Sequence, residues 1–222
     1  MYRERPDKRM DKPQLHGTPL SHFTRKIRIL LAELGVDFDF VRASSVLATS
    51  PESYAGNPLM RVPTLVHGET TVIDSDHIAR YLVTTFDPND TLRVRSERVP
   101  DMNRLAVVSG IMNNVVVLIL ARRGGLADIE KVAYFRKLTT AIDTALTWLD
   151  GDADPDDESF DYRDVATICM WQHLEHYALV PDLARHGRLA ARVSRFAARP
   201  SVTSTAPAVS LAEATADGWK PA

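Results

Sequence analysis

The chain has 222 residues, of which 45% are hydrophobic, and a formal net charge of −2, so its length and apolar content suffice for one large or two small domains. A charge so close to zero argues against a nucleic-acid partner held by bulk charge, and the single cysteine excludes an intrachain disulfide and fits a reducing compartment. No continuous apolar run reaches the roughly 18 residues of a membrane span, and the charged N-terminus MYRERPDKRMDKP lacks the apolar core of a secretory signal. We therefore expect a cytoplasmic protein that binds neither membranes nor nucleic acids.

The first predicted elements are a strand, a helix and a second strand. After an arm of residues 1–13, the apolar start of residues 15–18 predicts a strand that ends in a Gly-Thr-Pro turn. Residues 21–35 predict a helix that ends near Gly35, because apolar side chains recur at helical spacing: Ile27, Leu30, Leu31 and Leu34. The next residues alternate between apolar and acidic side chains, which predicts a half-buried strand with Val36, Phe38 and Phe40 on one face.

Residues 57–86, NPLMRVPTLVHGETTVIDSDHIARYLVTTF, predict a turn, a strand, a hairpin, a strand and a helix. Pro63 stands at the start of the short apolar strand 64–66, which makes the Val62–Pro63 bond a candidate for the cis form. In such a turn the backbone N–H and C=O of Val62 face solvent, where they can pair with an extended peptide as an additional strand.

The helix that follows is predicted to start at Asp74 and Ser75, with apolar residues four apart behind them: Ile78, Leu82 and Phe86. Ser75 is the expected N-cap. A hydroxyl with free N–H groups at a helix start favours a carboxylate, and the neighbouring carboxylate of Asp74 can hold an ammonium group. The pair therefore suits the zwitterionic end of an amino acid, while Val62 suits a peptide backbone.

The order of these residues resembles the glutathione S-transferase superfamily, whose thioredoxin-like domain carries an Asn-Pro, a Val-Pro with cis proline, a hairpin, an acid-Ser pair and an Ile-x-x-Tyr-Leu helix. The corresponding motifs here are Asn57-Pro58, Val62-Pro63, Asp74-Ser75 and Ile78-Ala79-Arg80-Tyr81-Leu82. The resemblance implies an α/β, thioredoxin-like domain over residues 14–87 that binds glutathione. It further implies an all-α, helical-bundle domain over residues 95–200, with tails at 1–13 and 203–222.

Ser21, at the predicted start of the first helix, is the expected catalytic residue. In the serine-type transferases that the chain resembles, Ser-x-x-x-x-(Lys/Arg)-(Val/Ile)-Arg places a serine where Ser21 stands, before Lys26-Ile27-Arg28. A hydroxyl donor at a helix N-terminus favours a thiolate over a free thiol, whose pKa is about 8.5. Taken alone, Ser21 is better explained as a helix N-cap; the presence of Val62 and Asp74-Ser75 in the same domain favours catalysis.

The resemblance implies the remaining ligand contacts. Glutathione would be bound by Phe23, Arg61, Val62, Pro63, Asp74 and Ser75. An apolar electrophile would occupy a pocket between the domains, near His22, Met112, Asn113 and Val116. Arg61 could equally well be an ordinary surface arginine without a ligand contact, and His22 could equally well be a loop residue without one. The chain departs from the family pattern at Asp74, one methylene shorter than the usual Glu or Gln, and at Met60, which replaces a common glycine.

Residues after the turn-rich break at 87–90 read as helical. Helices are predicted over 97–122, 128–149 and 189–198, with an acidic loop at 151–159. Asp161 and Asp164 form a capping-box variant at the start of another helix, and Phe160 is placed to pack on Val165; we interpret this pair as structural. The residues beyond 203 carry no readable pattern.

Two further groups of residues are better explained by packing than by chemistry. Cys169 lies between apolar neighbours in a predicted helix and is expected to be buried rather than nucleophilic. His173 and His176 lie three apart on that helix, but no further ligands stand at suitable spacing, so we expect no metal site.

The resulting hypothesis is a cytosolic glutathione transferase, homodimeric like most of its family, that activates the thiolate of glutathione for attack on a small electrophile. Two alternatives remain open from the sequence: a non-catalytic protein that keeps the fold for binding or regulation, and a glutathione-dependent isomerase or dehalogenase. Retention on a glutathione resin distinguishes catalytic members from proteins that have lost the site.

Overall fold

The computed structural model describes residues 11–43, 45–216 and 218. The chain divides into two compact units, one comprising Met1–Asn89 with Leu211–Ala222 and the other Asp90–Ser210. Most of the predicted N-terminal arm, residues 1–10, lies outside the described residues.

The first unit is built on a four-stranded sheet in the order β2-β1-β3-β4. β1 (Gln14–Gly17) pairs in parallel with β2 (Asp39–Arg42) and antiparallel with β3 (Thr64–His67), which in turn forms a hairpin with β4 (Thr70–Ile73). The predicted hairpin is confirmed. β2 begins later than predicted, because the N–H of Val36 bonds to the carbonyl of Leu31 and so completes the end of the preceding helix.

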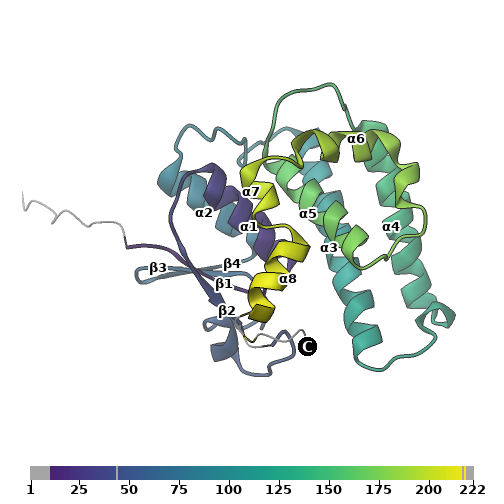
Figure 1. Cartoon of the computed structure of the whole chain (residues 1–222), viewed down its shortest axis with the longest axis horizontal. Helices are drawn as coiled ribbons and strands as arrows, with labels where there is room; N and C mark the ends of the chain where they lie inside the picture. The colour runs from purple at the N-terminus through teal and green to yellow at the C-terminus, as the bar shows by residue number, and fades with distance from the viewer. Residues whose placement is uncertain (1–10, 44, 217, 219–222) are drawn as a thin grey trace, which may run out of the picture. The chain divides into compact units, whose positions relative to one another are not determined.

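Two helices, α1 (His22–Glu33) and α2 (Ser75–Phe86), pack side by side against this sheet (Figure 1). Their apolar stripes are buried except at the last predicted residue of each, Leu34 and Phe86, which are half-buried. The buried residues pack with the central strands to form a core that includes Leu15, Ile27, Leu30, Leu65, Ile78 and Leu82. Gly35 follows α1 with a φ of 64°, the left-handed conformation that makes glycine the favoured residue at a helix end. The β-α-β-β-β-α order and the sheet topology are those of a thioredoxin-like domain.

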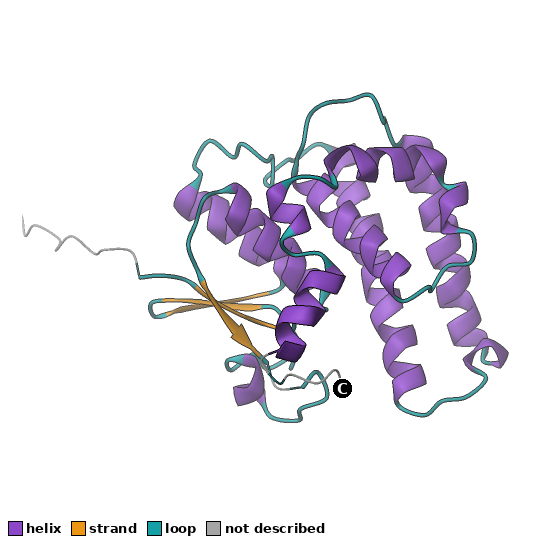
Figure 2. Cartoon of the chain, viewed as in Figure 1, coloured by secondary structure: helices purple, strands orange, loops and turns teal. Residues whose placement is uncertain are grey.

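The second unit is helical, as expected. It contains α3 (Val99–Arg123), α4 (Ala133–Asp152), α5 (Tyr162–His176), α6 (Gly187–Phe196) and α7 (Pro200–Thr203), and in Figure 2 α3 and α4 run alongside each other. α4 starts four residues after Ile129, because Ile129–Lys131 form a separate 3-10 turn. The segment expected as a C-terminal tail instead forms α8 (Pro207–Ala216), in which Ser210 and Ala214 are buried.

α3 is longer and more apolar than the continuous-run criterion suggested. By length and composition it would suffice to cross a membrane, and 28% of its most apolar 18-residue window is buried. The helix itself was predicted over 97–122, but the polar residues Ser109, Asn113 and Asn114 interrupt its apolar residues, so no continuous apolar run of that length occurs. Central helices of soluble proteins meet the same measure, so one such helix is weak evidence for a membrane span.

The capping box predicted at the start of α5 is confirmed. The carboxylate of Asp161 accepts from the N–H of Arg163 at 2.8 Å and of Asp164 at 3.4 Å, and the carboxylate of Asp164 accepts from the N–H of Asp161 at 3.1 Å. Phe160 packs on the ring of Phe196, with a centroid distance of 5.0 Å. The start of α5 is therefore anchored to α6 as well as capped.

Arg192 of α6 ties the same capping box to the acidic loop. Its Nε and Nη2 donate to the two carboxylate oxygens of Asp164 at 2.9 and 2.8 Å, and both side chains are at most 5% exposed. The guanidinium also donates to the loop carbonyls of Asp154, Asp157 and Ser159. One buried cation thus fixes both a helix start and the loop before it.

Replacing Arg192 with methionine should lower the free energy of unfolding by about 3–5 kcal/mol, because it leaves the buried carboxylate of Asp164 without its cation. Urea denaturation measures the loss. The matched variant Arg192→Lys retains the charge without the planar fork and should lose less. A loss below about 1 kcal/mol for Arg192→Met would show that the pair is not a stabilising element.

Candidate functional site

The strand register brings three loops of the first unit together where β1 and β4 end and β3 begins; this place is called the sheet edge. Thr64, the first residue of β3, lies opposite His16 near the end of β1 and opposite Ile73 at the end of β4. Because both pairings are antiparallel, the end of β1, the start of β3 and the end of β4 lie side by side. The loops that leave the sheet there carry the predicted site residues.

Ser21 lies on the first of these loops, directly before α1. Its hydroxyl oxygen accepts from the N–H of Thr24 at 3.2 Å, so Ser21 is the N-cap of α1. Within the described part of the chain, the Ser21 hydroxyl proton has no acceptor. A hydroxyl can accept and donate at once, so the capping role leaves a donor available at the positive end of the helix.

The loop that leads to Ser21 is held by a close approach of the backbone to α1. A Cβ atom on Gly17 would lie 2.2 Å from the methyl carbon of Thr24. The end of β1 must therefore be glycine for α1 to start where it does.

The second loop contains the cis peptide bond predicted between Val62 and Pro63, which is confirmed. Among the described residues, the N–H and C=O of Val62 make no hydrogen bond. Buried Asn57 shapes this loop: its side-chain amide donates to the carbonyl of Arg61 at 2.9 Å, and its side-chain oxygen accepts from the N–H of Leu59 at 2.9 Å. The loop thus presents an unpaired backbone edge in a fixed position.

Met60 explains how this loop tolerates the loss of a glycine. Its φ is 49°, in the left-handed region, and its side chain is 40% exposed. The backbone therefore keeps a conformation that glycine favours, with methionine bearing a modest conformational cost.

The third loop corrects the prediction for the start of α2. The N-cap is Asp74, not Ser75: one oxygen of its carboxylate accepts from the N–H of Asp76 at 2.9 Å and of His77 at 3.2 Å. Asp74 has a φ of 70° and is exposed, whereas Ser75 is the first helical residue and 4% exposed. Either residue type caps helices well, and the backbone conformation decides between them.

A buried ion pair between α1 and α2 was not predicted. The Nζ of Lys26, whose side chain has no exposed surface, lies 2.7 Å from a carboxylate oxygen of Asp76. Lys26 Nζ also lies 5.7 Å from the centre of the Phe23 ring. Sequence supplied one signal, a lysine within the apolar stripe of α1, but its partner lies 50 residues away.

The remaining predicted residues are placed as follows. Arg61 is exposed, and Pro63 and His22 are buried, the ring of His22 packing edge-on against Phe23 at a centroid distance of 4.6 Å. On α3, Met112 has no exposed surface and belongs to the core, while Val116 is half-buried. Asn113 is exposed and bonds back to the carbonyl of Ser109 at 2.9 Å.

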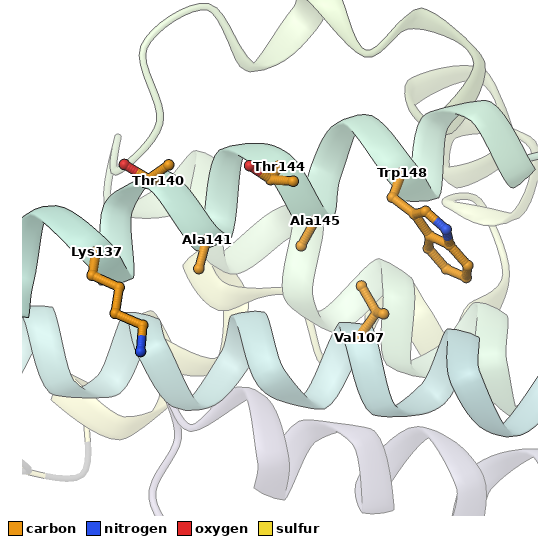
Figure 3. Close-up of a pocket in the computed structure, with 7 residues that line it drawn as sticks. All are labelled: Val107, Lys137, Thr140, Ala141, Thr144, Ala145 and Trp148. Atoms are coloured by element: carbon orange, nitrogen blue, oxygen red, sulfur yellow. The ribbon is translucent and has the colours of Figure 1, made fainter.

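The second unit has an open groove of about 590 Å³ between α3 and α4. Figure 3 shows Val107 of α3 and Trp148 of α4 pointing toward one another across it. The rest of its lining comes from α4: Lys137, Thr140, Ala141, Thr144 and Ala145. None of the residues expected to bind a second substrate lines this groove.

Cys169 is buried in α5, as predicted. Across residues 11–43, 45–216 and 218, no group of three or more His, Cys, Asp or Glu side chains is arranged to hold a metal ion.

Comparison with known proteins gives a family for the first unit. Residues 15–90 match the family model of the glutathione S-transferase N-terminal domain. Glutathione S-transferase 1 of Dianthus caryophyllus is 36% identical over 83 residues, which cover 36% of this chain and 38% of that protein. The alignment thus spans less than half of the relative.

Solved structures extend the similarity to most of the chain. A glutathione S-transferase of Methylobacterium radiotolerans, in complex with glutathione sulfonate, matches with a TM-score of 0.74 at 24% identity, over 88% of this chain and 95% of that one. A glutathione transferase family member of Pseudomonas fluorescens with bound glutathione matches with a TM-score of 0.73 at 25% identity, over 88% and 99%. Residues 15–90 therefore form a glutathione S-transferase N-terminal domain, and most of the chain shares the fold of solved glutathione transferases.

Proposed function

We propose that this protein is a serine-type glutathione transferase that binds glutathione at the sheet edge where Ser21, Val62 and Asp74 converge. The observation that carries the proposal is the set of three complementary groups at one edge: a hydroxyl donor at a helix start, an unpaired backbone edge, and a carboxylate beside a second helix start. Similar folds crystallised with glutathione or its sulfonate support the same ligand.

Each group matches one part of the tripeptide. The N–H and C=O of Val62 would pair with the cysteinyl backbone as a short added strand. The second oxygen of the Asp74 carboxylate would hold the γ-glutamyl ammonium, and Ser75, the first residue of α2 and ahead of the N–H groups that Asp74 caps, would hold its carboxylate. Arg61, exposed on the second loop, is placed in sequence to reach the glycyl carboxylate, and the half-buried Phe23 ring would pack beside the ligand.

Ser21 would then stabilise the thiolate. The thiol proton passes to solvent, and the sulfur accepts a hydrogen bond from the Ser21 hydroxyl. The electron pair of the sulfur then forms the bond to the electrophilic atom, while either a leaving group departs with its bonding pair or a π bond opens to an anion that solvent protonates. Lowering the pKa of the thiol by two units requires about 2.7 kcal/mol. One charge-assisted hydrogen bond and the end of α1 can supply that amount.

Replacing Ser21 with alanine should raise the pKa of the bound thiol by about two units and lower kcat at neutral pH about 20-fold, while glutathione still binds. A pH titration of thiolate ultraviolet absorbance, with the ligand bound, measures the pKa directly. Ser21→Gly is the matched control for capping, because glycine caps a helix within a few tenths of a kcal/mol of serine but has no hydroxyl.

The catalytic role of Ser21 requires the alanine and glycine variants to lose activity equally, and Ser21→Thr to retain most of it. A thiol pKa unchanged in both variants would leave Ser21 as a helix cap alone. Failure of the native chain to bind a glutathione resin at moderate salt would instead support a protein that keeps the fold without the chemistry.

We also propose that the electrophile is small and apolar and that α3 contributes to its recognition. The exposed face of α3 near Asn113 and Val116 is a better candidate than Met112, which is committed to the core. A cytoplasmic location agrees with the single buried thiol, which is stable in a reducing compartment.

We propose a homodimer that uses the groove between α3 and α4. The groove is apolar at its centre, and Trp148 remains 45% exposed in the single chain. The first unit also has solvent-exposed apolar side chains: Leu59 is 61% exposed and Met60 is 40% exposed. Burial of these surfaces in a second copy would remove both from water.

Trp148→Glu should shift the protein from dimer to monomer, because a carboxylate in the groove opposes burial. Light scattering coupled to gel filtration measures the mass. Trp148→Phe is the matched control and should remain dimeric at the same concentration. A monomeric native protein at micromolar concentration would refute the dimer.

A further inference from the structure

The first turn of α2 and its N-cap carry two carboxylates, whereas the zwitterionic end of glutathione has one ammonium group for them to bind. Asp74 and Asp76 both lie there, and the backbone N–H of Asp76 already bonds to the Asp74 carboxylate at 2.9 Å. The carboxylate of Asp76 is therefore within the same turn that would receive the γ-glutamyl carboxylate. Unless it is neutralised, it repels that group.

Lys26 is placed to neutralise Asp76. Its Nζ lies 2.7 Å from the Asp76 carboxylate, and its side chain has no exposed surface, whereas that of Asp76 is 30% exposed. A cation with no exposed surface cannot reach a ligand bound at the sheet edge. Lys26 thus acts through Asp76, and the pair links α1, which Ser21 caps, to α2, which Asp74 caps.

We propose that Lys26 is a positioning residue of the glutathione site, and that it sets the charge at the start of α2 so that this helix accepts the α-carboxylate of the γ-glutamyl group. The inference rests on the proposed function, because it concerns the same ligand. If Lys26 has this role, removing it weakens the binding of ligands that carry the α-carboxylate more than the binding of ligands that lack it. A purely structural ion pair would affect both kinds of ligand equally.

The test compares two ligands by isothermal titration: glutathione, and 4-aminobutyryl-cysteinyl-glycine, which lacks only the α-carboxylate. Lys26→Met should weaken glutathione binding at least about tenfold, the change that about 1.4 kcal/mol produces. Binding of the analogue should change less than about threefold. Lys26→Arg keeps the charge and is the matched control, with glutathione affinity close to that of the native chain.

Asp76 provides the reciprocal variants. Asp76→Asn removes the repulsive charge and leaves Lys26 in place, so glutathione should bind at least as tightly as to the native chain. Lys26→Met/Asp76→Asn removes both charges and should recover most of the affinity lost in Lys26→Met. The Asp76→Asn arm decides the matter if Lys26→Met does not fold.

Equal loss of affinity for both ligands in Lys26→Met, or weaker glutathione binding in Asp76→Asn, would overturn the inference and leave the pair as a structural contact. A native chain that binds neither ligand would overturn the proposed function itself. Native binding that Lys26→Met leaves unchanged would overturn the role of Lys26 while the proposed function stands.

Discussion

The position of Thr64 between two antiparallel neighbours is the constraint on which the site depends. It pairs with His16 on β1 and with Ile73 on β4, so one residue fixes the relative position of three loops. A shift of one residue in either pairing would exchange buried and exposed faces, and would also separate Ser21 from Asp74. Asn57 reinforces this point, because its buried amide holds the loop that enters β3 at Thr64.

The N-termini of α1 and α2 lie at these loops and give the site partial positive charge and polar side chains. Ser21 and Asp74 are both N-caps, and each leaves polar capacity that the cap does not consume: the hydroxyl proton of one and a carboxylate oxygen of the other. The same residues thus stabilise helices and face a ligand. The helical unit uses charge differently, because Arg192 and Asp164 are buried in its interior and tie a helix start to a loop.

Features set by neighbouring residues could be predicted from the sequence. The cis bond at Val62–Pro63, the hairpin around Gly68 and the capping box at Asp161 are all local, and the structure confirms them. The choice of Asp74 over Ser75 as N-cap could not be predicted, because it depends on a φ of 70° that neither side chain dictates. The pairing of Lys26 with Asp76, and of Arg192 with Asp164, depends on tertiary packing across 50 and 28 residues. α8 was missed because its Ala-rich sequence has little contrast between apolar and polar positions.

The central claim is that the sulfur of glutathione lies against the Ser21 hydroxyl while its cysteinyl backbone pairs with Val62. A crystal structure of the native chain with glutathione bound tests it directly. We expect the sulfur within hydrogen-bonding distance of Ser21 Oγ and two backbone hydrogen bonds between the ligand and Val62. A tripeptide bound elsewhere, or bound with its sulfur directed away from the start of α1, would contradict the account.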